Sequence, residues 1–199
     1  FLVSGETLVR NLQLGLRRAA AFGGAMDVGY LPDMFGHVAQ MPQLLDQFGF
    51  AHSVVWRGVP SAVDRSGFWW TAPDGTTIRA EYLPERYGNG ARVPDDAKAL
   101  LRLVDGFVTT HDDLLDGPVL WMVGTDHQTP RPWLGRVVLE ANDLQDDYEL
   151  VIRSLAEHVA SAPTSGLPEW TGELRSGARA NLLMGVASNR TDVKVAAAT

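Results

Sequence analysis

The chain has 199 residues, of which 45% are hydrophobic and 21% are charged. This composition is typical of a globular domain and excludes a low-complexity chain. The absence of cysteine excludes a disulfide framework, a thiolate zinc site and a cysteine nucleophile. The formal net charge of −7 repels phosphate backbones, so we expect no nucleic-acid partner. No apolar run approaches the roughly 18 residues of a membrane span, so we expect no membrane partner either.

The first half of the chain alternates between helical and extended patterns. Leucines four residues apart predict a helix over residues 6–21. Short apolar runs predict buried strands at 25–31 and 52–56, and the pattern between them predicts a helix at 40–47. The dipeptide Asp74-Gly75 favours a β-hairpin between the runs that flank it.

The second half continues this alternation. An apolar stripe predicts a helix over 95–110, and the continuous apolar run at 119–123 predicts a central strand. Ser154 and Glu157 form the signature of a capping box at a helix start. The remaining expected elements are a helix at 133–145, short strands at 148–152 and 170–174, and a last helix from about Arg179 onward.

These elements favour an α/β fold: a mostly parallel sheet with flanking helices, with the hairpin at 67–83 as an excursion from it. In such sheets the chemistry lies beyond the carboxyl ends of the strands. Three of the expected strands are followed there by polar residues: Asp33 after the first, Arg57 after the second, and Asp126-His127 after the run at 119–123. We therefore expect these side chains to share one rim of the sheet.

Two carboxylates that converge on one pocket suit the cleavage of a glycosidic bond, provided that one is ionised and the other carries a proton. An arginine beside one carboxylate would keep it ionised. Each residue also has a structural explanation. Asp33 could cap the next helix, Arg57 could be a surface charge, and His37 and His127 could be structural or orienting.

Several motifs closely resemble family 38 of the glycoside hydrolases, the class II α-mannosidases, in its bacterial branch. The segment Gly29–His37, followed by 40–45, is similar to the nucleophile segment of that family. Trp56-Arg57-Gly58 resembles its next strand end, and 124–128 resembles its acid/base loop. The segments 172–175, 180–183 and 188–190 resemble the passage into a helical domain. The resemblance thus implies a partial catalytic α/β domain at 1–175 and the beginning of a helical domain at 176–199.

The resemblance implies a retaining, metal-dependent hydrolase of α-mannosides, located in the cytoplasm. Asp33 would be the nucleophile and a ligand of the metal, usually zinc, although another divalent ion would fit. Arg57 would orient Asp33 and keep it ionised, and Asp126 would be the general acid and then the general base. As substrate contacts we expect His127 and two tyrosines after the hairpin, Tyr82 and Tyr87.

The metal site departs from the family pattern. Family members carry a His-x-Asp pair on their first strand and a later histidine, and neither appears in this chain. A catalytic zinc normally needs three protein ligands, so Asp33 alone would leave the site incomplete. Because the chain starts at Phe1 and ends in mid-pattern, we expect a piece of a longer protein, with a processed or trimmed chain as the alternative.

Three other functions stay open at this point. The chain could belong to a metal-dependent carbohydrate deacetylase on a related fold. It could be a catalytically inactive carbohydrate-binding domain that has kept the sheet. It could also be a stand-alone domain whose missing metal ligands come from a partner subunit, because the sequence does not give the oligomeric state.

Overall fold

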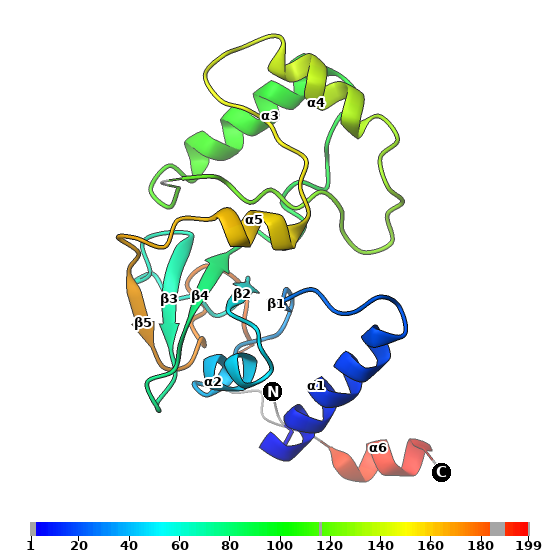
Figure 1. Cartoon of the computed structure of the whole chain (residues 1–199), viewed down its shortest axis with the longest axis vertical. Coiled ribbons are helices and arrows are strands. Elements are labelled where there is room, and N and C mark those ends of the chain that lie inside the picture. Colours follow the sequence, from blue (N-terminus) through cyan, green and yellow to red (C-terminus); the bar gives the residue numbers. More distant parts are fainter. Residues whose placement is uncertain (1–2, 116, 184–189, 199) are drawn as a thin grey trace.

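A single five-stranded sheet organises the lower half of the molecule (Figure 1). The computed structural model describes residues 3–115, 117–183 and 190–198. All neighbouring strands are parallel except β3 and β4, which form an antiparallel hairpin, so the expected mostly parallel α/β fold is confirmed. In spatial order the strands are β1 (Val28–Leu31), β2 (His52–Val55), β4 (Thr77–Tyr82), β3 (Gly67–Thr71) and β5 (Glu169–Thr171).

Three of the helices begin at residues whose side chains cap them. The Ser4 hydroxyl accepts a hydrogen bond from the backbone of Thr7, and Asp96 caps its helix in the same way. The capping box of Ser154 and Glu157 is present as predicted. The helices of the described chain are α1 (Gly5–Ala20), α2 (Met41–Gln47), α3 (Ala97–Thr110), α4 (Leu134–Asn142), α5 (Leu155–Ser161) and α6 (Thr191–Ala198).

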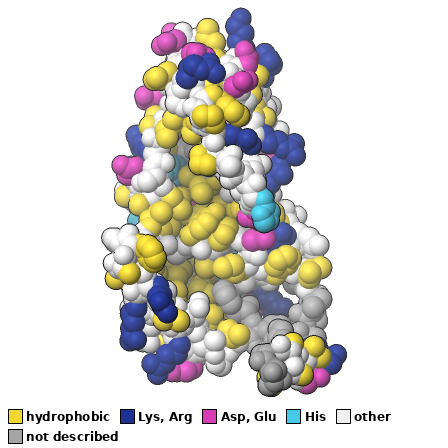
Figure 2. Space-filling model, turned by 90° about the vertical axis from the view of Figure 1, so that its right-hand side faces the viewer, with side chains coloured by type: hydrophobic (Ala, Val, Ile, Leu, Met, Phe, Trp, Pro, Cys, Tyr) yellow, Lys and Arg dark blue, Asp and Glu magenta, His cyan; other side chains and the backbone are white. Residues whose placement is uncertain are grey.

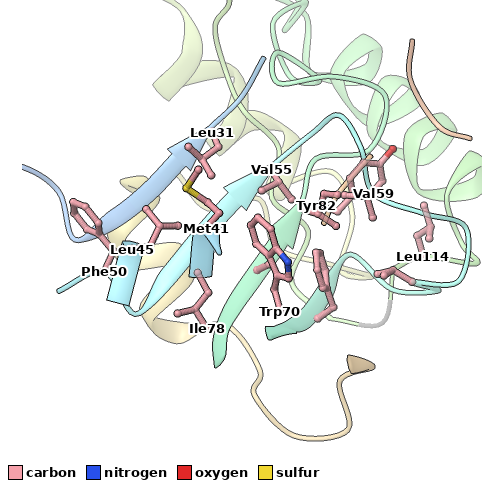
Figure 3. Packing of buried hydrophobic residues seen from close by; sticks show 14 residues of the cluster. Leu31, Met41, Leu45, Phe50, Val55, Val59, Trp70, Ile78, Tyr82 and Leu114 are labelled. Atoms are coloured by element: carbon pink, nitrogen blue, oxygen red, sulfur yellow. The ribbon is translucent and has the colours of Figure 1, made fainter. Parts of the chain in front are cut away.

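One face of the sheet is hydrophobic and is covered by α2. Alternate residues of each strand point to this face, among them Leu31, Val55 and Ile78. Met41 and Leu45 of α2 pack against them, and the Trp70 side chain lies in the middle of the cluster (Figure 3). Leu31 and Val55 are the last residues of β1 and β2, and their packing in this cluster holds the two strand ends side by side.

The opposite face carries a buried ion pair beneath α5. Arg79 Nη2 lies 2.7 Å from Glu81 Oε2, and the two side chains are only 4% and 3% exposed. Arg79 Nε also donates to the carbonyl of Pro163, which follows α5. The pKa of Glu81 is raised, because burial outweighs the attraction of Arg79 and the Ser66 hydroxyl. The pair thus joins the centre of the sheet to the α5 segment.

A second packing unit lies above the sheet in Figure 1. Helices α3 and α4 pack against each other through a cluster that includes Leu100 and Val137. The segment after residue 117 crosses between α3 and α5: Trp121 contacts Phe107 of α3, and Leu120 packs with Val159 of α5. This crossing leads the chain to Asp126.

The hairpin and two predicted strands differ from the expectation. The hairpin is not an excursion, because β4 pairs with β2 in the middle of the sheet. The runs 119–123 and 148–152 form no strand, because side-chain amides take up backbone groups in both. Asn89 binds Leu120 and Met122 in the first run, and Asn142 binds Leu150 in the second.

The last helix also differs from the expectation. Residues 179–183 are not helical, although the sequence predicts a helix from about Arg179 onward. Arg179 instead donates from Nη2 to the carbonyl of Val63 and stacks on the ring of Tyr82. These contacts hold the segment against the sheet domain. In the described chain, the helix of this region is α6, which starts at Thr191.

We expect Glu81→Gln to lower the free energy of unfolding by about 3–5 kcal/mol, because it leaves the Arg79 charge buried without its partner. Urea denaturation of the chain measures this loss. The double variant Arg79→Met/Glu81→Leu is the control, since replacing both charges by apolar groups is often neutral. A Glu81→Gln variant as stable as the original chain would show that the ion pair contributes nothing.

Candidate active site

The register of β1 and β2 brings Asp33 and Arg57 together. Leu31 pairs with Val55, and each functional residue lies two positions beyond its member of that pair. Arg57 Nε donates to Asp33 Oδ1 over 2.7 Å. The arginine side chain is 14% exposed, whereas that of the aspartate is 44% exposed. Asp33 therefore presents a carboxylate to solvent with a largely buried cation behind it.

Arg57 is held on several sides. Its guanidinium carbon lies 3.8 Å from the centre of the Trp56 ring and 4.3 Å from that of Phe35. Its Nη1 donates to the carbonyl of Asn181 over 2.6 Å. These contacts exclude the interpretation of Arg57 as a free surface charge. The helix-cap explanation for Asp33 also fails, because the N-cap of α2 is Gln40.

The loops that carry Asp33 and Arg57 are tied together by one later segment. The backbone N–H groups of His37 and Leu174 each donate to the other residue's carbonyl, over 2.9 and 3.0 Å. Ser176 donates its N–H to the carbonyl of Gly58. Gly58 has a φ of 93°, and a Cβ there would collide with the Leu174 carbonyl. The close approach therefore requires glycine at this position.

Asp126 is held by a different kind of partner. Tyr87 Oη donates to Asp126 Oδ2 over 2.7 Å. This bond is the main reason that the pKa of Tyr87 is raised; burial and the charges of Asp126 and Asp33 raise it further. The Tyr87 ring also meets the Trp56 ring edge-on, with centroids 5.5 Å apart. Trp56 thus contacts both Arg57 and Tyr87.

Both carboxylates therefore lie close enough to influence one phenol. Tyr30 of β1 lies near the same residues. Its pKa is raised by burial and by the charges of Tyr87 and Asp126. The structure thus brings Asp33, Arg57, Asp126 and Tyr87 into one site at the carboxyl ends of β1 and β2. Figure 2 shows hydrophobic side chains gathered over the middle of one face of the molecule, with carboxylate and histidine side chains at its margin.

Two other predicted substrate contacts lie differently. Tyr82 is 3% exposed and belongs to the core cluster under Arg179, so its position favours packing over contact with a substrate. His127 is exposed beside Asp126 and has a φ of 60°, in the left-handed region. A non-glycine residue in that conformation is uncommon and is often found where function requires it.

His37 belongs to the core rather than to the reacting surface. Its side chain is 1% exposed, and its ring meets that of Trp70 edge-on at 5.8 Å. Burial lowers its pKa to about 4, so the imidazole is neutral near pH 7. This agrees with the structural explanation that the sequence left open.

The described residues supply too few metal-binding side chains for the expected zinc site. Within residues 3–115, 117–183 and 190–198, no three His, Asp or Glu side chains lie close enough to hold a metal ion. Asp33 is bound to Arg57 and belongs to no such group of three within these residues. These residues therefore do not form a zinc site by themselves. In the same part of the chain, no helix is long and apolar enough to cross a membrane.

The sequence matches the family described as "Glycosyl hydrolases family 38 N-terminal domain" over residues 1–173. The chain belongs to glycosyl hydrolase family 38. A Halalkalibacterium halodurans protein named "Putative mannosylglycerate hydrolase" is 31% identical over 88% of this chain and 22% of its own length. "Alpha-mannosidase 2C1" of Mus musculus is 30% identical over 58% of this chain and 12% of its own length.

Solved structures agree with this family 38 membership. The crystal structure of an alpha-mannosidase from Enterococcus faecalis V583 superposes with a TM-score of 0.80. It is 28% identical to this chain and covers 88% of it, but only 21% of the alpha-mannosidase chain is matched. The family 38 chain thus spans about a fifth of the length of the Halalkalibacterium halodurans and Enterococcus faecalis proteins, and 12% of that of the mouse protein.

Sequence reasoning missed several residues that shape the site. Phe35 and Trp56 flank the arginine, and the Asn181 carbonyl binds it. The adjacency of Trp56 to Arg57 was a usable signal, since arginine often stacks on aromatic rings. The backbone contact of Asn181, 124 residues away in sequence, left no signal that a local pattern could show.

We expect the free energy of unfolding to fall by about 2–3 kcal/mol between pH 7 and pH 4.5 because of His37. The unfolded chain takes up the proton near pH 6.5, whereas the folded chain does so only near pH 4, so acid favours unfolding in this window. Urea denaturation of His37→Gln at both pH values should show a smaller loss. A change remains, because the lowered pKa values of His52 and His158 act in the same direction. Equal losses for both chains would contradict the assignment.

Proposed function

We propose that the protein containing this chain hydrolyses α-mannosides with retention of configuration at the anomeric carbon. Asp33 is the nucleophile, and Asp126 is the general acid and base. The observation that carries the proposal is the Arg57–Asp33 ion pair, with a half-exposed carboxylate in front of a largely buried guanidinium. The family and the mannosidase names of the relatives support the substrate class.

In the first step, a carboxylate oxygen of Asp33 attacks the anomeric carbon of the mannoside. The bond from that carbon to the leaving oxygen breaks as Asp126 transfers its proton to this oxygen. The product is a covalent mannosyl ester of Asp33 and a free alcohol. Arg57 keeps Oδ1 of Asp33 in place, and we assign the attack to the other oxygen.

In the second step, a water molecule attacks the same carbon, and Asp126 accepts a proton from this water. The ester bond breaks, mannose leaves and Asp33 is again a carboxylate. The Tyr87 hydroxyl, which donates to Asp126 Oδ2, suits the ionised form of Asp126 that this step requires. Exposed His127 is placed to contact the sugar or the leaving group.

A metal belongs to this proposal only as an expectation from the family. Because the described residues bring no three metal-binding side chains together, we derive no step through zinc. Asp33 is the residue of this chain that we assign to such an ion. Its other ligands would come from outside the described residues, either from the rest of a longer chain or from a partner subunit. We keep residues 1–175 as a partial catalytic domain and place the protein in the cytoplasm on the same family argument.

Variants of the two carboxylates in the full-length protein test the proposal. Asp33→Ala should lower kcat/KM for every aryl α-mannoside by at least about a thousandfold, because no nucleophile remains. Asp126→Ala should lower it about 100-fold or more for a phenyl mannoside, but little for a 2,4-dinitrophenyl mannoside, whose leaving group needs no proton. Proton NMR should show α-mannose as the first product.

Asp46→Ala is the matched control, since this exposed aspartate on α2 lies outside the site. Its kinetics should equal those of the original protein. Release of acetate from acetylated sugars without mannoside hydrolysis would support the deacetylase alternative. Binding of mannose that survives Asp33→Ala, with no turnover by either protein, would support an inactive binding domain.

The isolated 199-residue chain should not hydrolyse aryl mannosides above background, with or without added zinc. The reason is the donor set of the described residues, which offers Asp33 as the one expected ligand. Product release can be followed by absorbance, alongside metal content after dialysis. Zinc-dependent turnover by this chain alone would overturn the argument about the metal.

A further inference from the structure

The segment Gly88-Asn89-Gly90 runs against the chain that leads to Asp126. Asn89 is 9% exposed, and its side-chain amide makes two hydrogen bonds to the run 119–123. Nδ2 donates to the carbonyl of Leu120 over 3.1 Å, and Oδ1 accepts from the backbone N–H of Met122 over 2.7 Å. The backbone N–H of Gly90 donates to the Met122 carbonyl over 2.9 Å. The Asn89 side chain and the Gly90 backbone thus take the place of a neighbouring strand.

The two glycines allow this close approach. A Cβ at Gly88 would lie 2.8 Å from both the Gly124 carbonyl oxygen and Thr125 Cβ. A Cβ at Gly90 would lie 2.9 Å from the Met122 carbonyl oxygen. Both distances are too short for real contacts, so any larger residue would push the two segments apart. The close packing of Gly88 against Gly124 and Thr125 therefore reaches the residue directly before Asp126.

This contact connects the two partners of a functional hydrogen bond. Tyr87 directly precedes the glycine–asparagine–glycine segment, and Asp126 follows the segment that it holds. The Tyr87–Asp126 bond of 2.7 Å therefore depends on how these two stretches align. Nothing else in the described chain gives 119–123 a strand partner, since this run lies outside the five-stranded sheet.

We infer that Asn89 is a positioning residue: through Leu120 and Met122 it sets Asp126 against Tyr87 and so places the proton donor of the reaction. The inference rests on the proposed function for its catalytic part. Its structural part, the clamp of Asn89 on residues 119–127, can be measured without any substrate.

The kinetic test compares two leaving groups in the full-length protein. Asn89→Ala should lower kcat/KM for phenyl α-mannoside about 10- to 100-fold, because a displaced acid transfers its proton poorly. The same variant should lower kcat/KM for 2,4-dinitrophenyl α-mannoside less than about threefold. Equal losses for both substrates would reveal a merely structural role and overturn the inference.

Asn142 offers a matched control. Like that of Asn89, its amide donates to one backbone carbonyl and accepts from one backbone N–H, here both of Leu150 and both over 2.9 Å. Asn142→Ala therefore removes an equivalent pair of bonds from a segment that does not lead to the site. It should leave the ratio of the two kcat/KM values unchanged. A change as large as that of Asn89→Ala would overturn the inference.

Hydrogen exchange measured by mass spectrometry tests the clamp directly. Asn89→Ala should speed amide exchange at least about tenfold in peptides covering 119–127, and leave β2 and β4 unchanged. Unchanged exchange in 119–127 would overturn the inference. If the original protein hydrolyses neither mannoside, the proposed function fails, and the exchange result alone decides whether the clamp exists.

Two further variants test the inference if Asn89→Ala does not fold. Asn89→Asp keeps the size of the side chain but turns an oxygen, in place of an N–H group, toward the Leu120 carbonyl. Gly88→Ala leaves Asn89 intact and separates the segments by contact with Gly124 and Thr125. Both should show the same dependence on the leaving group as Asn89→Ala. The inference is overturned if the variants that fold show none.

Discussion

The parallel pairing of β1 with β2 is the constraint on which the site depends. Because Leu31 lies opposite Val55, the chain leaves both strands at the same level, and Asp33 and Arg57 meet after two further residues. The hydrophobic face beneath α2 keeps this register, since a slip by one residue would turn Leu31 and Val55 to the other side of the sheet. Packing in the core therefore sets the geometry of a polar pair at the surface.

The two carboxylates of the site receive chemically different partners. Asp33 is bound by a guanidinium, whereas Asp126 is bound by the neutral hydroxyl of Tyr87. A permanent cation suits a nucleophile that must carry charge, and a neutral donor suits a group that must lose and regain a proton. Trp56 contacts both partners: the Arg57 guanidinium lies over its ring, and the Tyr87 ring meets it in a T-shaped contact. One indole thus serves both halves of the site.

Local patterns in the sequence were sufficient for most of the fold and for the first half of the site. The hairpin at Asp74-Gly75, the capping box at Ser154 and helices α1 to α5 depend on neighbours within a few residues, and they formed as expected. The run at 119–123 has the composition of a buried strand but no strand beside it, because Asn89 occupies its backbone groups. Hydropathy cannot detect such competition. The same limit applies to Tyr82, whose burial depends on Arg179, almost a hundred residues later.

The backbone contacts of Leu174 and Ser176, and the carbonyl of Asn181, lie more than a hundred residues after the loops that they hold. A ribosome releases the chain from its amino end, so Asp33 and Arg57 emerge well before these contacts can form. The Asp33–Arg57 pair therefore gains these contacts only after the segment beyond the sheet has emerged and folded back over it. Ending the chain at the last strand of the sheet would remove this support and leave Arg57 without its bond to the Asn181 carbonyl.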